Sequence, residues 1–77
     1  MGPIIKVGQY YRFKNPDEDC YIKITEIRIR SIIFNWVRPP SGKVNTCIWN
    51  ARRVKRYIKK KVMKEQKNSL VCIKYFE

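Results

Sequence analysis

Half of the chain's 18 basic residues lie in one short segment, residues 51–67, where Glu65 is the one acid. The nine cations are Arg52, Arg53, Lys55, Arg56, Lys59, Lys60, Lys61, Lys64 and Lys67. The segment therefore holds +8 of the formal net charge of +12. A long field of one sign repels itself, and a polyanionic partner is the commonest reason for a folded protein to keep one. The pattern predicts contacts to phosphate groups, with nucleic acid as the first candidate partner.

Apolar residues recur through the same segment at helical spacing. Ala51, Val54, Tyr57, Ile58 and Val62 fall within an arc of ~140° on a helical wheel. The opposite side carries cations, and no acid lies between Asn50 and Lys64. A merely solvated helix face usually mixes signs, often as Glu–Lys pairs four residues apart. We therefore expect phosphate contacts from Arg52, Arg53, Arg56, Lys59, Lys60 and Lys64.

A second group of cations precedes this segment and lies among aromatic residues. It comprises Arg28, Arg30, Arg38 and Lys43. Tyr10 and Trp36 are the candidates for stacking on bases or wedging between base steps, because aromatic rings interleaved with Arg do both in nucleic-acid complexes. The competing interpretation is that large rings, Trp36 and Trp49 above all, fill the core of so small a domain.

Catalytic and metal-binding chemistry has little support in this sequence. The chain has no His, the usual general base and metal ligand. The acids of residues 17–19 match no calcium-loop spacing and are typical of a solvated turn. Cys20, Cys47 and Cys72 lack the tight pairs of a zinc site, so we expect small buried thiols. We predict a protein that is not an enzyme and uses no metal or cofactor.

Length and composition favour one small β-rich domain over residues 1–77. A chain of 77 residues has too little interior for a large enzyme-style cleft. Eleven Ile and six Val, against one Leu and one Ala, favour a pleated core over a helical bundle. No stretch reaches the roughly 20 apolar residues of a membrane span, and no signal-peptide core is present. We expect an intracellular protein of the cytoplasm, nucleoid or nucleus, without membrane contact.

Alternation of apolar and polar residues predicts four strands within residues 5–49, at 7–14, 20–27, 32–38 and 44–49. Asn50 is placed to cap a basic amphipathic helix over residues 50–67. Lys61 falls inside the apolar arc of that helix, which indicates that the helix ends or distorts nearby. Residues 70–76 are predicted as a fifth strand. The expected fold is mainly β with one helix, a small curved sheet or barrel of about five strands.

Four sequence stretches carry a resemblance to a known group of folds. They are Val7-Gly8-Gln9-Tyr10-Tyr11, Tyr21-Ile22-Lys23-Ile24, Ile33-Phe34-Asn35-Trp36-Val37 and Ile48-Trp49. Over about residues 5–60, the order of strands, turns and helix resembles the SH3-like small barrels, which include Tudor-like and chromatin-protein-like modules. The plan is also similar to that of small basic archaeal chromatin proteins, in which a helix follows a barrel. The resemblance implies a fold and transfers no binding residues.

Two functions fit these observations. The first is a small non-enzymatic nucleic-acid-binding protein that contacts backbone phosphates with modest sequence preference, with DNA ahead of RNA as the partner. The second is a viral or mobile-element interaction protein, an inhibitor whose basic helix occupies an acidic or nucleic-acid-binding surface of a host protein. An anionic membrane is a weaker candidate, because the apolar arc has no Trp or Phe. The oligomeric state stays open, since an exposed sheet edge can pair two copies.

Overall fold

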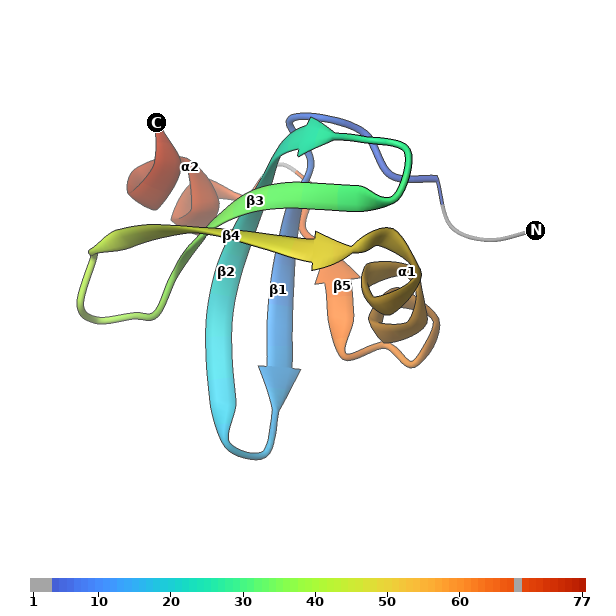
Figure 1. The fold of residues 1–77 in the computed structure, drawn as a ribbon. Helices are drawn as coiled ribbons and strands as arrows, with labels where there is room; N and C mark the ends of the chain where they lie inside the picture. Colours follow the sequence, from blue (N-terminus) through green and yellow to red (C-terminus); the bar gives the residue numbers. More distant parts are fainter. Residues whose placement is uncertain (1–3, 68) are drawn as a thin grey trace.

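The computed structural model describes residues 4–67 and 69–77 and shows one antiparallel sheet of five strands with two helices (Figure 1). The elements are β1 (Tyr10–Asn15), β2 (Glu18–Ile27), β3 (Ser31–Val37), β4 (Val44–Asn50), α1 (Ala51–Lys59), β5 (Met63–Glu65) and α2 (Leu70–Phe76). The strand order is β4-β3-β2-β1-β5, so β4 and β5 are its two edges. The prediction of a mainly β fold is confirmed. Of the two expected forms, the curved open sheet is the one observed.

The inner face of this curved sheet carries the main core. Alternate residues of β2 point into it, with Ile22 1% and Ile24 0% exposed. Phe13 from β1 and Phe34 from β3 join the same cluster, and Val54 of α1 completes it from the helix side. The predicted alternation of β2 is therefore confirmed, because period-2 spacing places every second side chain on one face.

The first strand begins later than predicted. Residues 7–14 alternate in sequence, but Val7 is 61% exposed and β1 starts only at Tyr10. Gly8 has a φ of +92°, a left-handed conformation that glycine adopts at little cost, and this residue turns the chain. The Gly8 backbone N–H donates to the Ile24 carbonyl at 2.8 Å, which ties this turn to β2.

The start of α1 agrees with the sequence. The Asn50 side-chain oxygen accepts a hydrogen bond from the Arg52 backbone N–H at 2.8 Å, as an N-cap residue should. A second hydrogen bond joins the helix start to the β2–β3 turn: the Ala51 backbone N–H donates to the Arg30 carbonyl at 2.9 Å. These two bonds fix the direction in which α1 leaves β4.

The end of α1 is earlier than predicted, because the helix stops at Lys59 and does not continue to residue 67. Lys61 has a φ of +62°. Its backbone N–H donates to the Ile58 carbonyl at 3.1 Å, and the Val62 N–H donates to the Tyr57 carbonyl at 3.0 Å. This pair of bonds defines a Schellman helix end, which requires a left-handed residue at the position of Lys61.

The early end of the helix has a packing explanation. A continued helix would bring the charged Lys61 onto the face that docks on the core. The left-handed turn instead directs Lys61 to solvent, and of the two apolar residues that follow, Val62 is half-buried against the core and Met63 is 1% exposed within it. Met63 then pairs with Phe13, so that β5 extends the sheet beside β1.

The prediction of a strand over residues 70–76 is wrong, because these residues form α2. A seven-residue run in which Lys74 is the one charged residue does not distinguish a strand from a buried helix segment. Ser69 decides between them locally. Its side-chain oxygen accepts a hydrogen bond from the Cys72 backbone N–H at 3.2 Å, an N-cap that starts the helix.

α2 packs on the outer face of the sheet. The ring of Tyr10 stacks on Phe76 with centroids 6.2 Å apart, and Tyr21 stacks on Tyr75 at 6.3 Å. Cys72 is 0% exposed. The sheet is therefore covered on both sides, by α2 on the outer face and by α1 along the inner face (Figure 1).

The Schellman turn gives a direct test of this helix end. Lys61→Gly should stabilise the fold by about 0.5–1 kcal/mol, because glycine adopts a positive φ without steric penalty, although it loses more backbone entropy on folding. Lys60→Gly is the matched control, since Lys60 is right-handed with a φ of −78° and should lose stability. Urea unfolding of both variants measures the difference. A Lys61→Gly protein less stable than the parent would contradict this description of the turn.

Candidate nucleic-acid interface

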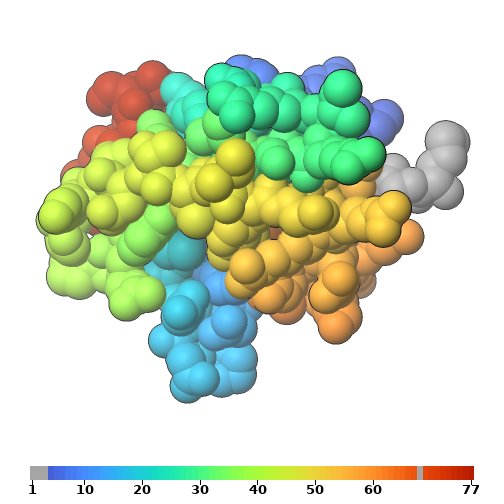
Figure 2. All heavy atoms as spheres, viewed as in Figure 1, coloured from blue at the N-terminus to red at the C-terminus, as the bar shows by residue number. Residues whose placement is uncertain are grey.

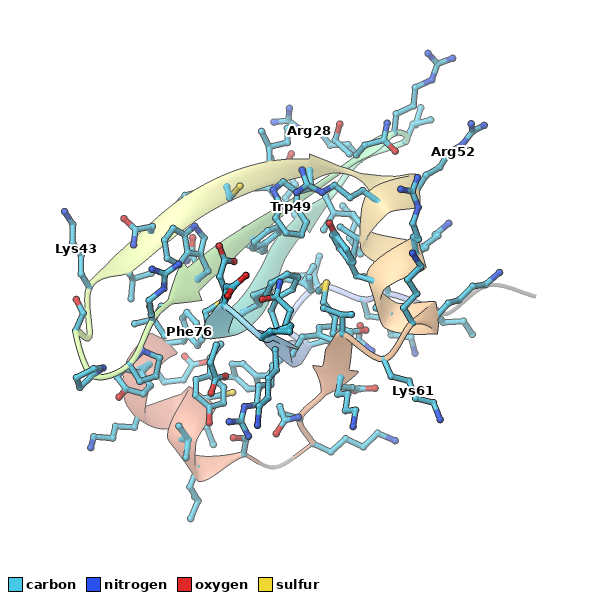
Figure 3. The ribbon with its side chains drawn as sticks, turned by 90° about the horizontal axis from the view of Figure 1, so that it is seen from below. Arg28, Lys43, Trp49, Arg52, Lys61 and Phe76 are labelled. Carbon is cyan, nitrogen blue, oxygen red and sulfur yellow. The ribbon has the colours of Figure 1, made fainter. Side chains whose placement is uncertain are left out.

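The nine cations of residues 51–67 are all exposed. Within residues 4–67 and 69–77 none of the nine takes part in an ion pair. α1 accounts for this arrangement: Val54 is fully buried and Tyr57 and Ile58 are half-buried against the core. The cations between them must therefore face outward. Figure 3 shows Arg52 and Lys61 extending away from α1 and from the turn that follows it.

Most of the negative charge lies elsewhere. Four of the six acids form ion pairs: Asp19 with Arg12 at 2.8 Å, Glu77 with Lys23 at 2.6 Å, Glu18 with Arg38 at 3.8 Å, and Glu26 with Arg28. All four cations in these pairs lie outside residues 51–67. The end of the β1–β2 hairpin carries three of the six acids and projects from the body of the molecule (Figure 2). The fold thus separates the acids from the cations of α1.

The hydrogen bonds between Arg12 and Asp19 show how firmly one of these pairs is made. Two guanidinium nitrogens of Arg12 reach the two carboxylate oxygens of Asp19, at 3.0 and 2.8 Å. This bidentate contact holds the pKa of the Asp19 carboxyl below its usual value. Asp19 is thereby committed to Arg12 and does not pair with a cation of α1.

Arg53 differs from the other cations of α1. Its guanidinium lies 4.0 Å from the centroid of the Trp49 ring and 5.6 Å from that of Tyr57. Cation–π contacts of this kind hold the side chain over the aromatic rings. Arg53 therefore links the charged outer side of α1 to the aromatic cluster beneath it.

The fold brings Arg30 to the beginning of α1. Arg30, Arg52 and Lys55 line a cleft of about 540 Å³ between the β2–β3 turn and the helix. The sequence placed Arg30 in a separate group of strand cations. Pairing of β3 with β4 explains the difference, since Ser31 pairs with Asn50 and carries its neighbour Arg30 to the helix start.

A second basic cleft lies at the other end of α1. It has a volume of about 380 Å³, and Arg12, Lys14, Lys61 and Lys64 contribute four cations to its lining. The sequence predicted Lys64 as a phosphate contact on the basic helix. In the structure Lys64 lies on β5, opposite Arg12 of β1. Sequence reasoning missed Lys14 and Lys61 as site residues. The misfit of Lys61 in the apolar arc was the one signal that could have revealed it.

Three of the predicted cations, Arg28, Arg38 and Lys43, do not lie with the cations around α1. Arg28 lies on the β2–β3 turn and pairs with Glu26. Arg38, Lys43 and Trp36 lie at the opposite end of the β3–β4 pair, where they line a separate cleft of about 300 Å³. Figure 3 shows Lys43 and Arg52 at opposite sides of the molecule. Of the ten predicted cations, seven therefore lie on or around α1, Arg38 and Lys43 lie at the other end of the sheet, and Arg28 joins neither group.

Tyr10 is not available as an open stacking platform. One face of its ring lies against Phe76, its hydroxyl donates to the Glu77 side chain, and the Lys23 ammonium lies 5.7 Å from its centroid. The hydrogen bond to Glu77 raises the pKa of the Tyr10 hydroxyl to about 12. The sequence could not indicate this, because the cover comes from α2, which was predicted as a strand.

We call the continuous set of exposed cations on and around α1 the basic surface. It comprises Arg30, Arg52, Arg53, Lys55, Arg56, Lys59, Lys60, Lys61 and Lys64. Positively charged clefts at both ends of one short helix concentrate the positive potential along it. Such a surface suits a linear array of negative charges better than a single small anion.

Other chemistries leave few traces in the part of the chain that the structure describes. No three His, Cys, Asp or Glu residues there come together as metal ligands. None of its helices has the length and apolar content needed to cross a membrane. Comparisons with protein-family models, with curated proteins and with solved structures found no match for the chain. The site must therefore be interpreted from its own geometry.

The three cysteines are reduced thiols in different environments. Burial raises the pKa of the Cys20 thiol to about 11 and also raises that of Cys72. Cys47 is half-buried on β4. A raised thiol pKa lowers the fraction of reactive thiolate at a given pH.

Alkylation rates should therefore rank the three thiols. Because Cys20 and Cys72 are buried and burial raises the pKa of both thiols, iodoacetamide at pH 8 should modify the half-buried Cys47 faster than either of them. Peptide mass spectrometry over a time course measures this ranking, and urea should abolish it. If Cys20 in the folded protein reacted as fast as Cys47, the buried position of Cys20 would be wrong.

Proposed function

We propose that this protein is a small non-enzymatic nucleic-acid-binding protein whose basic surface contacts backbone phosphates. DNA is the first candidate partner. One observation carries the proposal: a docked helix, its flanking turns and β5 together present nine exposed cations that form no ion pair among the described residues. Neutralising several phosphates would release their counterions, which is the main source of affinity for a surface of this kind.

The helix itself indicates that these charges are kept for a partner. Arg52, Arg56 and Lys60 follow one another four residues apart, as do Lys55 and Lys59. Like charges at this spacing destabilise a helix by about 0.2–0.5 kcal/mol per pair. The fold tolerates this cost because Val54 and the half-buried Tyr57 anchor the other side of the helix. Polyanion binding would replace the repulsion with attraction.

The composition of the surface supports modest sequence preference. Most of its members are Lys, which acts on phosphates largely as a point charge, and contacts to a uniform backbone carry no sequence information. The order of strands and turns up to Lys59 is also the order on which the resemblance to SH3-like modules was based. That resemblance is compatible with nucleic-acid binding but does not by itself argue for it.

Charge reversal on α1 tests the proposal. If about five phosphates are neutralised, the logarithm of the binding constant should fall with the logarithm of salt concentration at a slope near −4 to −5. Arg56→Glu/Lys60→Glu should weaken binding to every oligonucleotide and make the slope shallower. The control Lys6→Glu/Lys74→Glu changes the net charge equally on residues outside the basic surface. Fluorescence anisotropy at several salt concentrations measures all three proteins.

The same double variant should keep the parent's fold while it loses affinity, because the side chains of Arg56 and Lys60 are exposed and take part in no ion pair among the described residues. A thermal melting transition close to that of the parent separates a binding defect from misfolding. A salt-independent association, or one that the α1 variant and the control weaken equally, would contradict a phosphate-binding role for α1. Tight, salt-sensitive binding to an acidic protein without any to nucleic acid would support the inhibitor alternative.

Unrelated duplexes of equal length should bind with affinities that agree within about tenfold, roughly 1.4 kcal/mol. Competition between labelled and unlabelled duplexes of different sequence measures this spread. A sequence preferred by a thousandfold would instead require direct base readout by the arginines of the basic surface.

A further inference from the structure

We propose that an aromatic cleft on the inner side of the open sheet binds one unpaired nucleobase of a strand held by the basic surface. The inference rests on the proposed function and extends it, since it adds a preference for single strands or loops over continuous duplex. It concerns a different part of the molecule from the phosphate contacts, and it assigns a role to residues that those contacts do not use.

The cleft is built mainly from aromatic and apolar side chains. It has a volume of about 180 Å³ and is lined by Phe13, Glu18, Cys20, Ile22, Phe34, Trp36, Arg38, Cys47 and Trp49. Edge-to-face contacts fix Trp49, whose ring centroid lies 5.1 Å from that of Phe34 and 5.9 Å from that of Phe13. Figure 3 shows Trp49 on the inner side of β4, among the side chains that the sheet and α1 enclose. The cleft is therefore preformed.

The size of the cleft selects a small planar occupant. Pockets for drug-sized ligands and cofactors measure about 300–1,000 Å³. A cleft of about 180 Å³ is below that range and suits a single ring system. Trp36 is half-buried on one wall, where the Arg38 guanidinium lies 6.0 Å from its ring centroid, and Phe13 and Phe34 are 5% and 2% exposed and form the floor. Stacking of bases on such rings is a general mode of single-strand recognition.

The polar groups of the cleft suit the edge of a base. Only Glu18 and Arg38 carry charge in its lining, both are exposed, and their side chains lie 3.8 Å apart. A carboxylate accepts from the ring N–H or the exocyclic amino group of a base, and a guanidinium donates to ring nitrogens and carbonyls. Because the two charges offset each other, the rim neither attracts nor repels the adjoining phosphates strongly.

The cations around the cleft favour a ring that belongs to a polyanion, that is, a base of a nucleic-acid strand. Trp49 lines the cleft and is covered by Arg53 of the basic surface at 4.0 Å. On the far side, Trp36 and Arg38 also line the neighbouring cleft that contains Lys43. Cations therefore flank the aromatic cleft at both ends, and a strand that crosses it would contact them in turn. An apolar peptide side chain would fit the cleft but gains nothing from these charges.

The inference is tested by comparing the affinity of the protein for a strand with bases and for a matched strand without them. The probes are a labelled 12-residue oligothymidylate and a chain of equal length and charge in which every nucleotide is abasic. The parent protein should bind the oligothymidylate at least about fivefold more tightly. Trp36→Leu should abolish this ratio. Ile48→Ala is the matched control, because Ile48 lies on the other face of β4, is 54% exposed, and should preserve the ratio.

A second measurement on the unaltered protein covers the case in which Trp36→Leu does not fold. Cys47 lines the cleft, so saturating oligothymidylate should slow its alkylation by iodoacetamide, and the abasic chain should not. Equal affinity for the two chains, or equal protection of Cys47 by both, would overturn the base-binding cleft and leave phosphate binding intact. Failure of both chains to bind would overturn the proposed function together with this inference.

Discussion

The packing of α1 against the aromatic cluster of the inner face determines where the charge of this protein lies. Trp49 is at the centre of that cluster, with Phe13, Phe34 and Tyr57 around it. Val54 is buried beside them without exposed surface. Burying such side chains contributes on the order of 1.5–3 kcal/mol each, which exceeds the repulsion between neighbouring cations of one helix turn. The helix therefore keeps its place although its outer side is charged with one sign.

Covering the outer face of the sheet with α2 has a complementary effect. Tyr10 and Tyr21 are occupied by Phe76 and Tyr75, and Lys23 is paired with Glu77. This side of the molecule is therefore largely committed to internal contacts. The inner cleft and the cations of α1, by contrast, keep side chains that can meet a partner. The assignment of Tyr10 to a stacking role could not be tested in the sequence, because it depended on a helix that forms far away in the chain.

Local patterns predicted the parts of the fold that local forces decide. The alternation around Ile22 and Ile24 identified the buried face of β2, and Asn50 identified the start of α1, because both signals lie within a few residues. Lys61 indicated that the helix ends or distorts nearby but not that it ends in a Schellman turn, since that turn at a non-glycine residue depends on the burial of Met63, two residues further on. The run Leu70–Phe76 was misassigned because a short apolar run fits either a strand or a helix. The sequence could not show that Arg30 lies beside Arg52, or Arg12 beside Lys64, because these neighbours are brought together by the pairing of distant strands.

The most direct measurement of the central claim is the map of backbone amide shifts in an NMR titration with a short oligonucleotide. We expect the largest shifts along the basic surface, at Arg30, residues 52–61 and Lys64, with a second set around Trp36 and Cys47 when the strand is single. The amides of α2 should move least. A map with its maximum on α2, or with shifts spread evenly over the molecule, would contradict the assignment of binding to α1.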